Sequence, residues 1–185
     1  DLYKNMPIPE LAKNEEAMKM GFRLFANNCS VCHGADGGGN YGFPNLMDSD
    51  WLHGGSPEKI LETLVKGRIA AMPAWGPSLG EEKVLQVSEF VLKISGNEHD
   101  AAQAEIGAKV YAENCVACHG ADAKGQHATG APNLTDKIWL YEGTRENIRQ
   151  TIRSGRNNQM PAQEQTLMPE KIHLLAAYVY YLSNN

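Results

Sequence analysis

The sequence predicts an all-α fold in two similar domains, because its two halves repeat each other and both show helical periodicity. Gly21, Phe25 and Cys29 recur 86 residues later as Gly107, Tyr111 and Cys115. Apolar residues recur at helical spacing, and the strict alternation typical of half-buried strands is absent. Further along, the offset is 88 residues, and it joins Pro44 to Pro132, Trp51 to Trp139, Ser56 to Thr144, Arg68 to Arg156, Met72 to Met160, Lys83 to Lys171 and Phe90 to Tyr178. We therefore expect an internal duplication with two extra residues in one loop of the second half.

The duplication sets the expected domain boundaries. Residues 1–14, with Pro7 and Pro9, are expected to form an extended lead-in. A first domain then covers residues 15–96, a polar linker residues 97–100, and a second domain residues 101–185. Each domain of about 90 residues would have a thin apolar core, so a bound apolar group would add to its stability.

Three helices are expected in each half. In the first half, one begins at about Glu15 and runs directly into Cys29, with Met18, Phe22 and Phe25 on one face. A second begins at Ser56-Pro57-Glu58, which supplies a capping hydroxyl, a proline at the first helical position and an acid in the first turn; it ends at Gly67. The last carries Val84, Val87, Val91 and Ile94. Gly21 and Gly107 are expected to let the first and last helices cross closely, with aromatic rings around each crossing at Phe25, Phe90, Tyr111 and Tyr178.

A second repeated feature carries the chemistry. Cys29-Ser-Val-Cys32-His33 and Cys115-Val-Ala-Cys118-His119 both have the C-x-x-C-H spacing of covalent c-type haem attachment. Two thiols at this spacing can both form thioethers to one porphyrin, and the next histidine can bind the iron. A zinc site would bring two such cysteine pairs within about 20 residues, and a thioredoxin-like pair would need a βαβ context. We therefore expect two haem c groups, covalently attached.

The iron ligands follow from the repeat. His33 and His119 are the proximal ligands, and Met72 and Met160 are the expected distal ligands because no other methionines correspond between the halves. The other histidines have no repeat partner, so bis-histidine ligation is the minor alternative; they are His53, His99, His127 and His173. Histidine–methionine ligation raises the reduction potential and closes the iron to other ligands. We expect each methionine to serve the haem of its own repeat, with a crossed arrangement as the alternative.

Three further pairs are expected in the haem environment. The backbone carbonyls of Pro44 and Pro132 could accept the second ring N–H of the axial histidines. Arg68 and Arg156 precede the methionine loops and could pair with haem propionates. Trp51 and Trp139 are expected to contact the edge of the macrocycle. For the arginines, the alternative is a solvated side chain at a helix end.

The charge and the haem-attachment motifs limit the expected binding partners and the expected cellular compartment. The formal net charge is −5, without blocks of like charge, which argues against nucleic acid and favours partners with basic faces. Haem attachment of this kind takes place outside the cytoplasm, so we expect a periplasmic protein. No apolar run approaches the ~18 residues of a membrane span, and no signal peptide is visible, which suggests a mature or trimmed form.

The layout resembles the class I cytochrome c fold, twice over. Longer stretches resemble the dihaem subunit (CcoP or FixP, subunit III) of cbb3-type cytochrome c oxidase; they are residues 6–12, 44–55, 71–75, 130–141 and 173–179, and the most specific is Gly130 to Tyr141. The resemblance implies an electron-transfer subunit that is not an enzyme on its own. Its expected partners are the catalytic and monohaem cytochrome c subunits, with a soluble cytochrome c or the bc1 complex as donor. Members of this family begin with a transmembrane anchor, so the parent protein is expected to be anchored in the bacterial inner membrane through a segment absent from this sequence.

Two other functions compete with this one. A free periplasmic dihaem carrier of the cytochrome c4 kind would share the haem sites but not the oxidase-like stretches. A dihaem peroxidase would need one iron with a vacant or displaceable ligand. Both halves supply a methionine at the matching position, which favours electron transfer.

Overall fold

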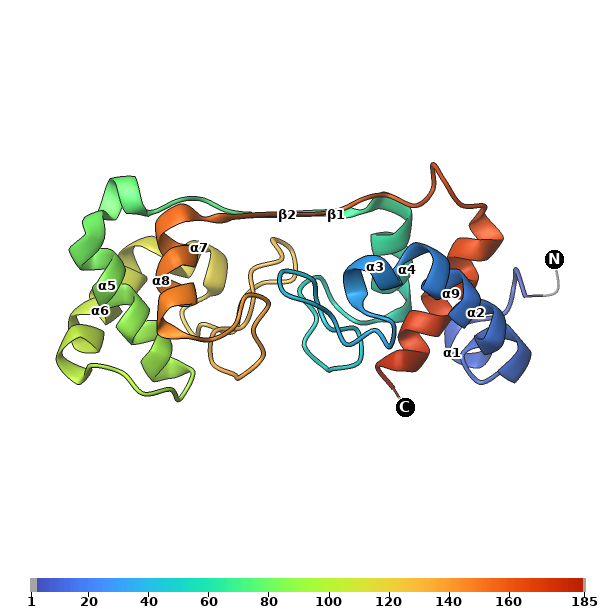
Figure 1. Ribbon diagram of the computed structural model, residues 1–185, viewed down its shortest axis with the longest axis horizontal. Helices are drawn as coiled ribbons and strands as arrows, with labels where there is room; N and C mark the ends of the chain where they lie inside the picture. The colour runs from blue at the N-terminus through green and yellow to red at the C-terminus, as the bar shows by residue number, and fades with distance from the viewer. Residues whose placement is uncertain (1–2, 185) are drawn as a thin grey trace. The chain divides into compact units, whose positions relative to one another are not determined.

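The computed structural model describes residues 3–184, and that part of the chain is mainly helical (Figure 1). None of its helices is long and apolar enough to cross a membrane. The elements are α1 (Ile8–Leu11), α2 (Glu15–Asn28), α3 (Ser30–His33), α4 (Pro57–Lys66), β1 (Arg68–Met72), α5 (Gly76–Ile94), α6 (Ala101–Asn114), α7 (Val116–His119), α8 (Arg145–Ser154), β2 (Arg156–Met160) and α9 (Pro169–Leu182).

The chain divides into two compact units that do not follow the two repeats. One, here called the terminal unit, combines residues 1–68 with residues 159–185, and the other, the central unit, is residues 69–158. The chain leaves the terminal unit through β1 and returns through β2, and these two strands pair with each other. Each unit therefore contains the first part of one repeat and the last part of the other.

This division differs from the expected boundaries at residues 15–96 and 101–185. The polar segment at residues 97–100 does not separate the units; it joins α5 to α6 inside the central unit. The physical reason is the duplication itself. Because the last helices of both repeats have similar apolar faces, either one can pack on the first helix of either repeat.

The terminal unit is built around α9, which packs on α1, α2 and α4. Leu11, Phe25 and Leu175 have no exposed surface in its core. The expected extended lead-in is wrong at α1, which begins after Pro7 and buries Ile8 and Leu11. Proline is tolerated at a helix start because the first turn needs no N–H from it, so Pro7 and Pro9 do not prevent this helix.

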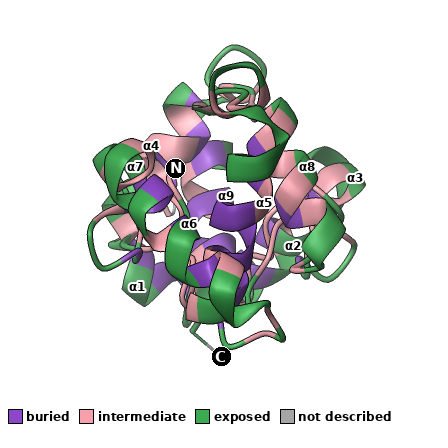
Figure 2. Ribbon diagram, turned by 90° about the vertical axis from the view of Figure 1, so that its left-hand side faces the viewer, coloured by how far each residue is buried: buried purple, intermediate pink, exposed green. Residues whose placement is uncertain are grey.

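The central unit is built around α5, which packs on α6 and α8. Val84, Val87 and Val91 are buried on α5, as the helical periodicity predicted, and Ile148 and Ile152 are buried on α8. Figure 2 shows buried residues along α5 and α9, the helices at the centre of the two units. The expectation of an all-α fold misses one feature, the two-stranded pairing of β1 and β2.

The predicted glycine crossings are present, but their partners are exchanged between repeats. A Cβ on Gly21 would lie 2.6 Å from Tyr178 Cβ, so α2 crosses α9. A Cβ on Gly107 would overlap the carbonyl oxygen of Gln86, so α6 crosses α5. Aromatic rings flank both crossings, with centroids 5.5 Å apart for Phe25–Tyr178 and 5.1 Å apart for Phe90–Tyr111.

Replacing Gly107 by alanine should destabilise the central unit. In an isolated helix the change would stabilise by about 1 kcal/mol, but here the new methyl group meets the backbone of Gln86 and Val87, which cannot move aside without shifting α5. Overpacking of this kind costs about 1–3 kcal/mol. Thermal unfolding of the holoprotein should show the loss, whereas Glu105→Ala, at an exposed position of the same helix, should change stability by less than about 0.5 kcal/mol. A Gly107→Ala protein as stable as the parent would contradict the crossing.

Candidate haem-binding sites

Both C-x-x-C-H segments have the same local structure. Helix α2 ends at Asn28, Cys29 donates its N–H to the Phe25 carbonyl at 2.8 Å, and the short helix α3 carries the chain to His33. Gly34 then turns the chain with φ of +81°, a conformation that favours glycine. The second segment repeats this arrangement with α6, Cys115, α7 and Gly120, which also has φ of +81°.

The histidine of each segment is buried and held by one ring nitrogen. His33 Nδ1 lies 3.0 Å from the Pro44 carbonyl oxygen, and His119 Nδ1 lies 3.1 Å from that of Pro132. These are the contacts expected from the sequence. A carbonyl can only accept, so Nδ1 carries the proton and donates, and Nε2 keeps a lone pair for a metal. Burial lowers the pKa of His119, although the bond to Pro132 opposes this shift, so the neutral form, which is the form able to bind a metal, is favoured.

Burial sets the protonation of one cysteine in each pair. Burial, with a smaller contribution from Cys32, raises the pKa of Cys29 to about 11, and burial with Cys118 does the same for Cys115. The thiol form of these two groups is therefore favoured at neutral pH. Within residues 3–184, no three His, Cys, Asp or Glu side chains are grouped as a metal-ion site requires.

The two arginines expected near the propionates share one arrangement. Arg68 Nε donates to Thr63 Oγ1 at 2.8 Å, and Arg156 Nε donates to Thr151 Oγ1 at 3.0 Å. The Nη2 atom of each guanidinium is buried without a hydrogen-bond partner among the described residues. A buried guanidinium nitrogen without a hydrogen bond is costly, and the carboxylate of a haem propionate would supply one.

Other charged and aromatic groups distinguish the two arginines. Arg68 Nη2 lies 3.5 Å from Glu62 Oε2, an ion pair at the surface of α4. Arg156 instead stacks on Tyr141, with its Cζ 3.8 Å from the ring centroid. Tyr141 also donates a hydrogen bond to Asn158 Oδ1. At the position of Tyr141, the terminal unit has His53.

The two tryptophans are positioned by glycines. A Cβ on Gly55 would lie 2.5 Å from Nε1 of Trp51, and a Cβ on Gly143 would lie 2.5 Å from Nε1 of Trp139. Both indoles are partly buried at the edge of their core clusters. A glycine at each position is therefore needed for the indole to lie flat against the loop backbone.

The structure places the methionines in exchanged units. Met160 packs against the core of the terminal unit, which contains His33, and Met72 packs against the core of the central unit, which contains His119. This placement does not support the expectation that each methionine serves the haem of its own repeat. Two of the unrepeated histidines bond backbone carbonyls: His99 Nδ1 lies 2.9 Å from Asn97 O, and His173 Nε2 lies 2.8 Å from Met6 O.

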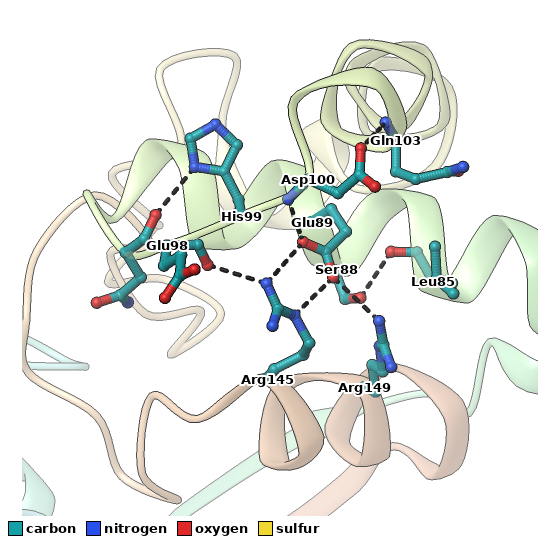
Figure 3. A network of polar contacts seen from close by, with 10 residues as sticks. Leu85, Ser88, Glu89, Glu98, His99, Asp100, Gln103, Arg145 and Arg149 are labelled. Carbon is teal, nitrogen blue, oxygen red and sulfur yellow. Dashed lines mark hydrogen bonds and ion pairs between the residues drawn. The ribbon is translucent and has the colours of Figure 1, made fainter.

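A buried carboxylate was missed by the sequence analysis. Glu89, on α5, is 2 % exposed and accepts hydrogen bonds from Arg145 Nε at 2.8 Å, Arg149 Nη2 at 3.0 Å and the amide of Asp100 at 2.8 Å. Figure 3 shows Arg145 and Arg149 of α8 reaching this carboxylate. Helical periodicity gave no sign of it, because Glu89 lies opposite the stripe formed by Val84, Val87 and Val91, where a solvated acid is expected. A comparison of the repeats could have found it, since Ala177 stands at the same position of α9.

The chain matches the family described as cytochrome C oxidase, cbb3-type, subunit III over residues 16–91 and again over residues 102–179. The chain belongs to this family. The two matches follow the two repeats, and they confirm the resemblance on which the sequence analysis relied.

Curated relatives agree with the family assignment. Over 182 residues, the chain is 49% identical to the cbb3-type cytochrome c oxidase subunit CcoP of Rubrivivax gelatinosus, with 98% of this chain and 60% of the relative covered. It is 42% identical over 177 residues to CcoP of Cereibacter sphaeroides (90% and 61% covered) and 40% identical over 191 residues to FixP of Azorhizobium caulinodans (96% and 65% covered). The chain thus spans less than two thirds of the length of these relatives. Their names do not favour the free carrier of the cytochrome c4 kind.

Proposed function

We propose that this chain binds two covalent haem c groups and relays electrons, one at a time, within a cbb3-type cytochrome c oxidase. The observation that carries the proposal is the pair of C-x-x-C-H segments in a member of the subunit III family, each with its histidine ring held by a proline carbonyl. Cys29 and Cys32 would hold one haem, and Cys115 and Cys118 the other.

One histidine and one methionine would hold the iron at each haem centre. His33 and His119 would hold the iron through Nε2, and Met72 and Met160 would hold it through their sulfur atoms. The haem iron supplies the one-electron chemistry when it is bound. With a histidine and a methionine of the protein as its ligands, each centre would exchange electrons and would not bind oxygen or peroxide. Oxygen reduction then belongs to a separate catalytic subunit.

The surrounding residues orient and tune the haem. Arg68 and Arg156 would pair their buried Nη2 atoms with propionates, which fits the missing hydrogen bonds at those atoms. The Pro44 and Pro132 carbonyls keep the imidazoles in one tautomer and orientation. Trp51 and Trp139, held against Gly55 and Gly143, would contact the edge of the macrocycle.

The proposed setting is the periplasmic side of the bacterial inner membrane. Partners would be the catalytic and monohaem cytochrome c subunits of the oxidase, with a soluble cytochrome c or the bc1 complex as donor. The formal net charge of −5 fits a donor or acceptor with a basic face. Attachment to the membrane would use a segment outside the sequence described here.

An anaerobic redox titration of the holoprotein, followed by optical and magnetic circular dichroism spectra, tests this function. Two one-electron steps from two low-spin haems are expected, and the reduced protein should pass electrons to the purified remainder of the oxidase. A high-spin haem in the oxidised protein would contradict the closed-centre proposal for that unit and would favour a peroxidase.

Removing either buried guanidinium should lower the potential of one haem. In Arg68→Gln, a positive charge near the propionates is lost, so the more positive oxidised haem becomes relatively more stable. A loss of about 1 kcal/mol corresponds to on the order of 40 mV for one electron. Lys66→Gln, which removes an exposed charge two residues away, should give a clearly smaller shift in the same titration. Equal shifts would show that Arg68 acts only as a distant surface charge.

A further inference from the structure

We propose that a charge pattern on α5 and α8 fixes a crossed arrangement in which each methionine serves the haem bound by the other repeat. Met160 then serves the haem on Cys29 and Cys32, and Met72 serves the haem on Cys115 and Cys118. The ligand part of this inference rests on the proposed function, whereas the crossing rests on the fold alone.

The methionine loops are held by the helices of the other repeat. In the terminal unit, Gln163 N donates to the Leu64 carbonyl at 2.9 Å, and a Cβ on Gly67 would lie 2.7 Å from Ala162 N. Gly67 has φ of +70°. The loop that begins at Met160 therefore lies directly against the end of α4, in the unit that contains His33.

The central unit repeats this contact with exchanged partners. Trp75 N donates to the Ile152 carbonyl at 3.0 Å, and a Cβ on Gly155 would lie 2.8 Å from Ala74 N. Gly155 has φ of +69°. The loop that begins at Met72 lies against the end of α8, in the unit that contains His119.

Ion pairs join α5 to α8 beside their apolar contacts. Glu89 binds Arg145 and Arg149, as described above, and Arg153 Nη2 lies 2.7 Å from Glu81 Oε2. Both acids belong to the first repeat and all three arginines belong to the second. Every one of these ion pairs therefore joins the two repeats.

The equivalent packing of α9 on α4 is apolar. The 88-residue register places Pro57, Leu61 and Val65 at the positions of the three arginines, and it places Pro169 and Ala177 at the positions of the two acids. Leu61 and Val65 pack against the core of the terminal unit, and Ala177 is fully buried there. Ion pairs thus supplement the apolar contact of α5 with α8, whereas the same positions of α4 and α9 are apolar.

Own-repeat packing would mismatch both helix pairs. Helix α5 would lie on α4, which would bury Glu89 against Leu61 with no cation. Helix α8 would lie on α9, which would set Arg149 against Ala177 with no anion. An unpaired buried charge is strongly unfavourable, so the sequence disfavours the own-repeat arrangement and specifies the crossed one. This use of charge to select between otherwise similar partners resembles the role of charged positions in coiled coils.

Cleavage of the segment between α5 and α6 tests the crossing without reference to the haem ligands. A protease site inserted beside the exposed Gly96 divides the full-length holoprotein into two fragments with one haem each. In the crossed arrangement each unit contains parts of both fragments, so they should co-elute on size exclusion in native buffer and separate only in denaturant. Two separate single-haem species in native buffer would overturn the proposal.

A variant distinguishes crossing from simple adhesion between two domains. Glu89→Ala removes a contact that joins the fragments only in the crossed arrangement, so the cleaved variant should separate at a lower denaturant concentration than the cleaved parent. Glu105→Ala, at an exposed position of α6, is the matched control and should leave the midpoint unchanged. An unchanged midpoint in the Glu89→Ala protein would overturn the proposed role of the charges.

Nuclear magnetic resonance of the reduced holoprotein tests the ligands. With the methionine methyl groups labelled, Met72→Leu identifies the Met72 signal by its loss. In the parent, this methyl should show contacts to the haem whose thioether bridges join Cys115 and Cys118, and contacts to the haem on Cys29 and Cys32 would overturn the pairing. If neither Met72 nor Met160 contacts a haem, the ligand assignment of the proposed function fails, and the cleavage result still decides the crossing.

Discussion

Glu89→Ala is expected to destabilise the central unit by about 3 kcal/mol. Removing one partner of a buried ion pair typically costs about 3–5 kcal/mol, and the lower figure applies because the Arg145 side chain is 43% exposed and can recover water. For a unit of this size the loss corresponds to on the order of 12–24 °C in melting temperature. Differential scanning calorimetry of the holoprotein would measure it.

A second acid on the same helix provides the control for Glu89. Glu81 also pairs with an arginine, but its side chain is 69% exposed, and exposed pairs contribute about 0–1 kcal/mol. Glu81→Ala should therefore change the melting temperature only slightly. Equal effects of the two substitutions would show that the burial of Glu89 does not matter.

The pH dependence of stability should change in the Glu89 variant. Burial raises the pKa of Glu89, but the Asp100 amide and the two arginines outweigh it, and the net pKa lies below the ordinary carboxyl value. Such a group contributes stability above its unfolded pKa and loses it as the pH falls through the lower folded pKa. The difference in unfolding free energy between the parent and Glu89→Gln should therefore shrink as the pH is lowered through the carboxyl range.

Met160→His is expected to lower the potential of one haem by on the order of 0.2–0.3 V, within the ~0.8 V range that axial ligands set. The imidazole replaces the thioether that favours the reduced iron, and the iron should stay low-spin. A redox titration should then show one unchanged step and one displaced step. By the crossed pairing, the displaced step belongs to the haem on Cys29 and Cys32.

The exposed Met168 offers a matched control for this substitution. It has no counterpart in the first repeat, and its side chain is 61% exposed. Met168→His should leave both potentials unchanged. A displaced redox step in the Met168→His protein, or the absence of a displaced step in the Met160→His protein, would contradict the assignment of Met160 as an iron ligand.

The helices and the histidine contacts could be predicted because their signals are local. Ser56 caps α4 by accepting from the Lys59 amide at 3.3 Å, and Gly67 ends it, as the sequence indicated. The His33–Pro44 bond spans a short loop. Helix α1 was missed because prolines usually mark extended chain, and only its burial against α9 makes a helix of one turn stable.

The crossing could not be predicted from the repeat alone, because the repeat makes two arrangements equally good at most positions. Gly21, for example, can accept the last helix of either half. The signal that separates the arrangements lies where the halves differ, at Glu89 against Ala177 and at Arg149 against Leu61. The β1–β2 pairing was missed for a separate reason. Neither Arg68–Met72 nor Arg156–Met160 shows the alternation of apolar and polar residues that predicts a strand.

The crossing also gives the protein an order of assembly. The central unit is a single continuous segment, so it can close as soon as residue 158 has emerged during synthesis or export. The terminal unit must wait for α9, at residues 169–182, before it can enclose the segment that ends at residue 68, and such distant contacts form slowly. Under the proposed function, the first cysteine pair would therefore stay accessible for haem attachment for longer than the second, although it is made first.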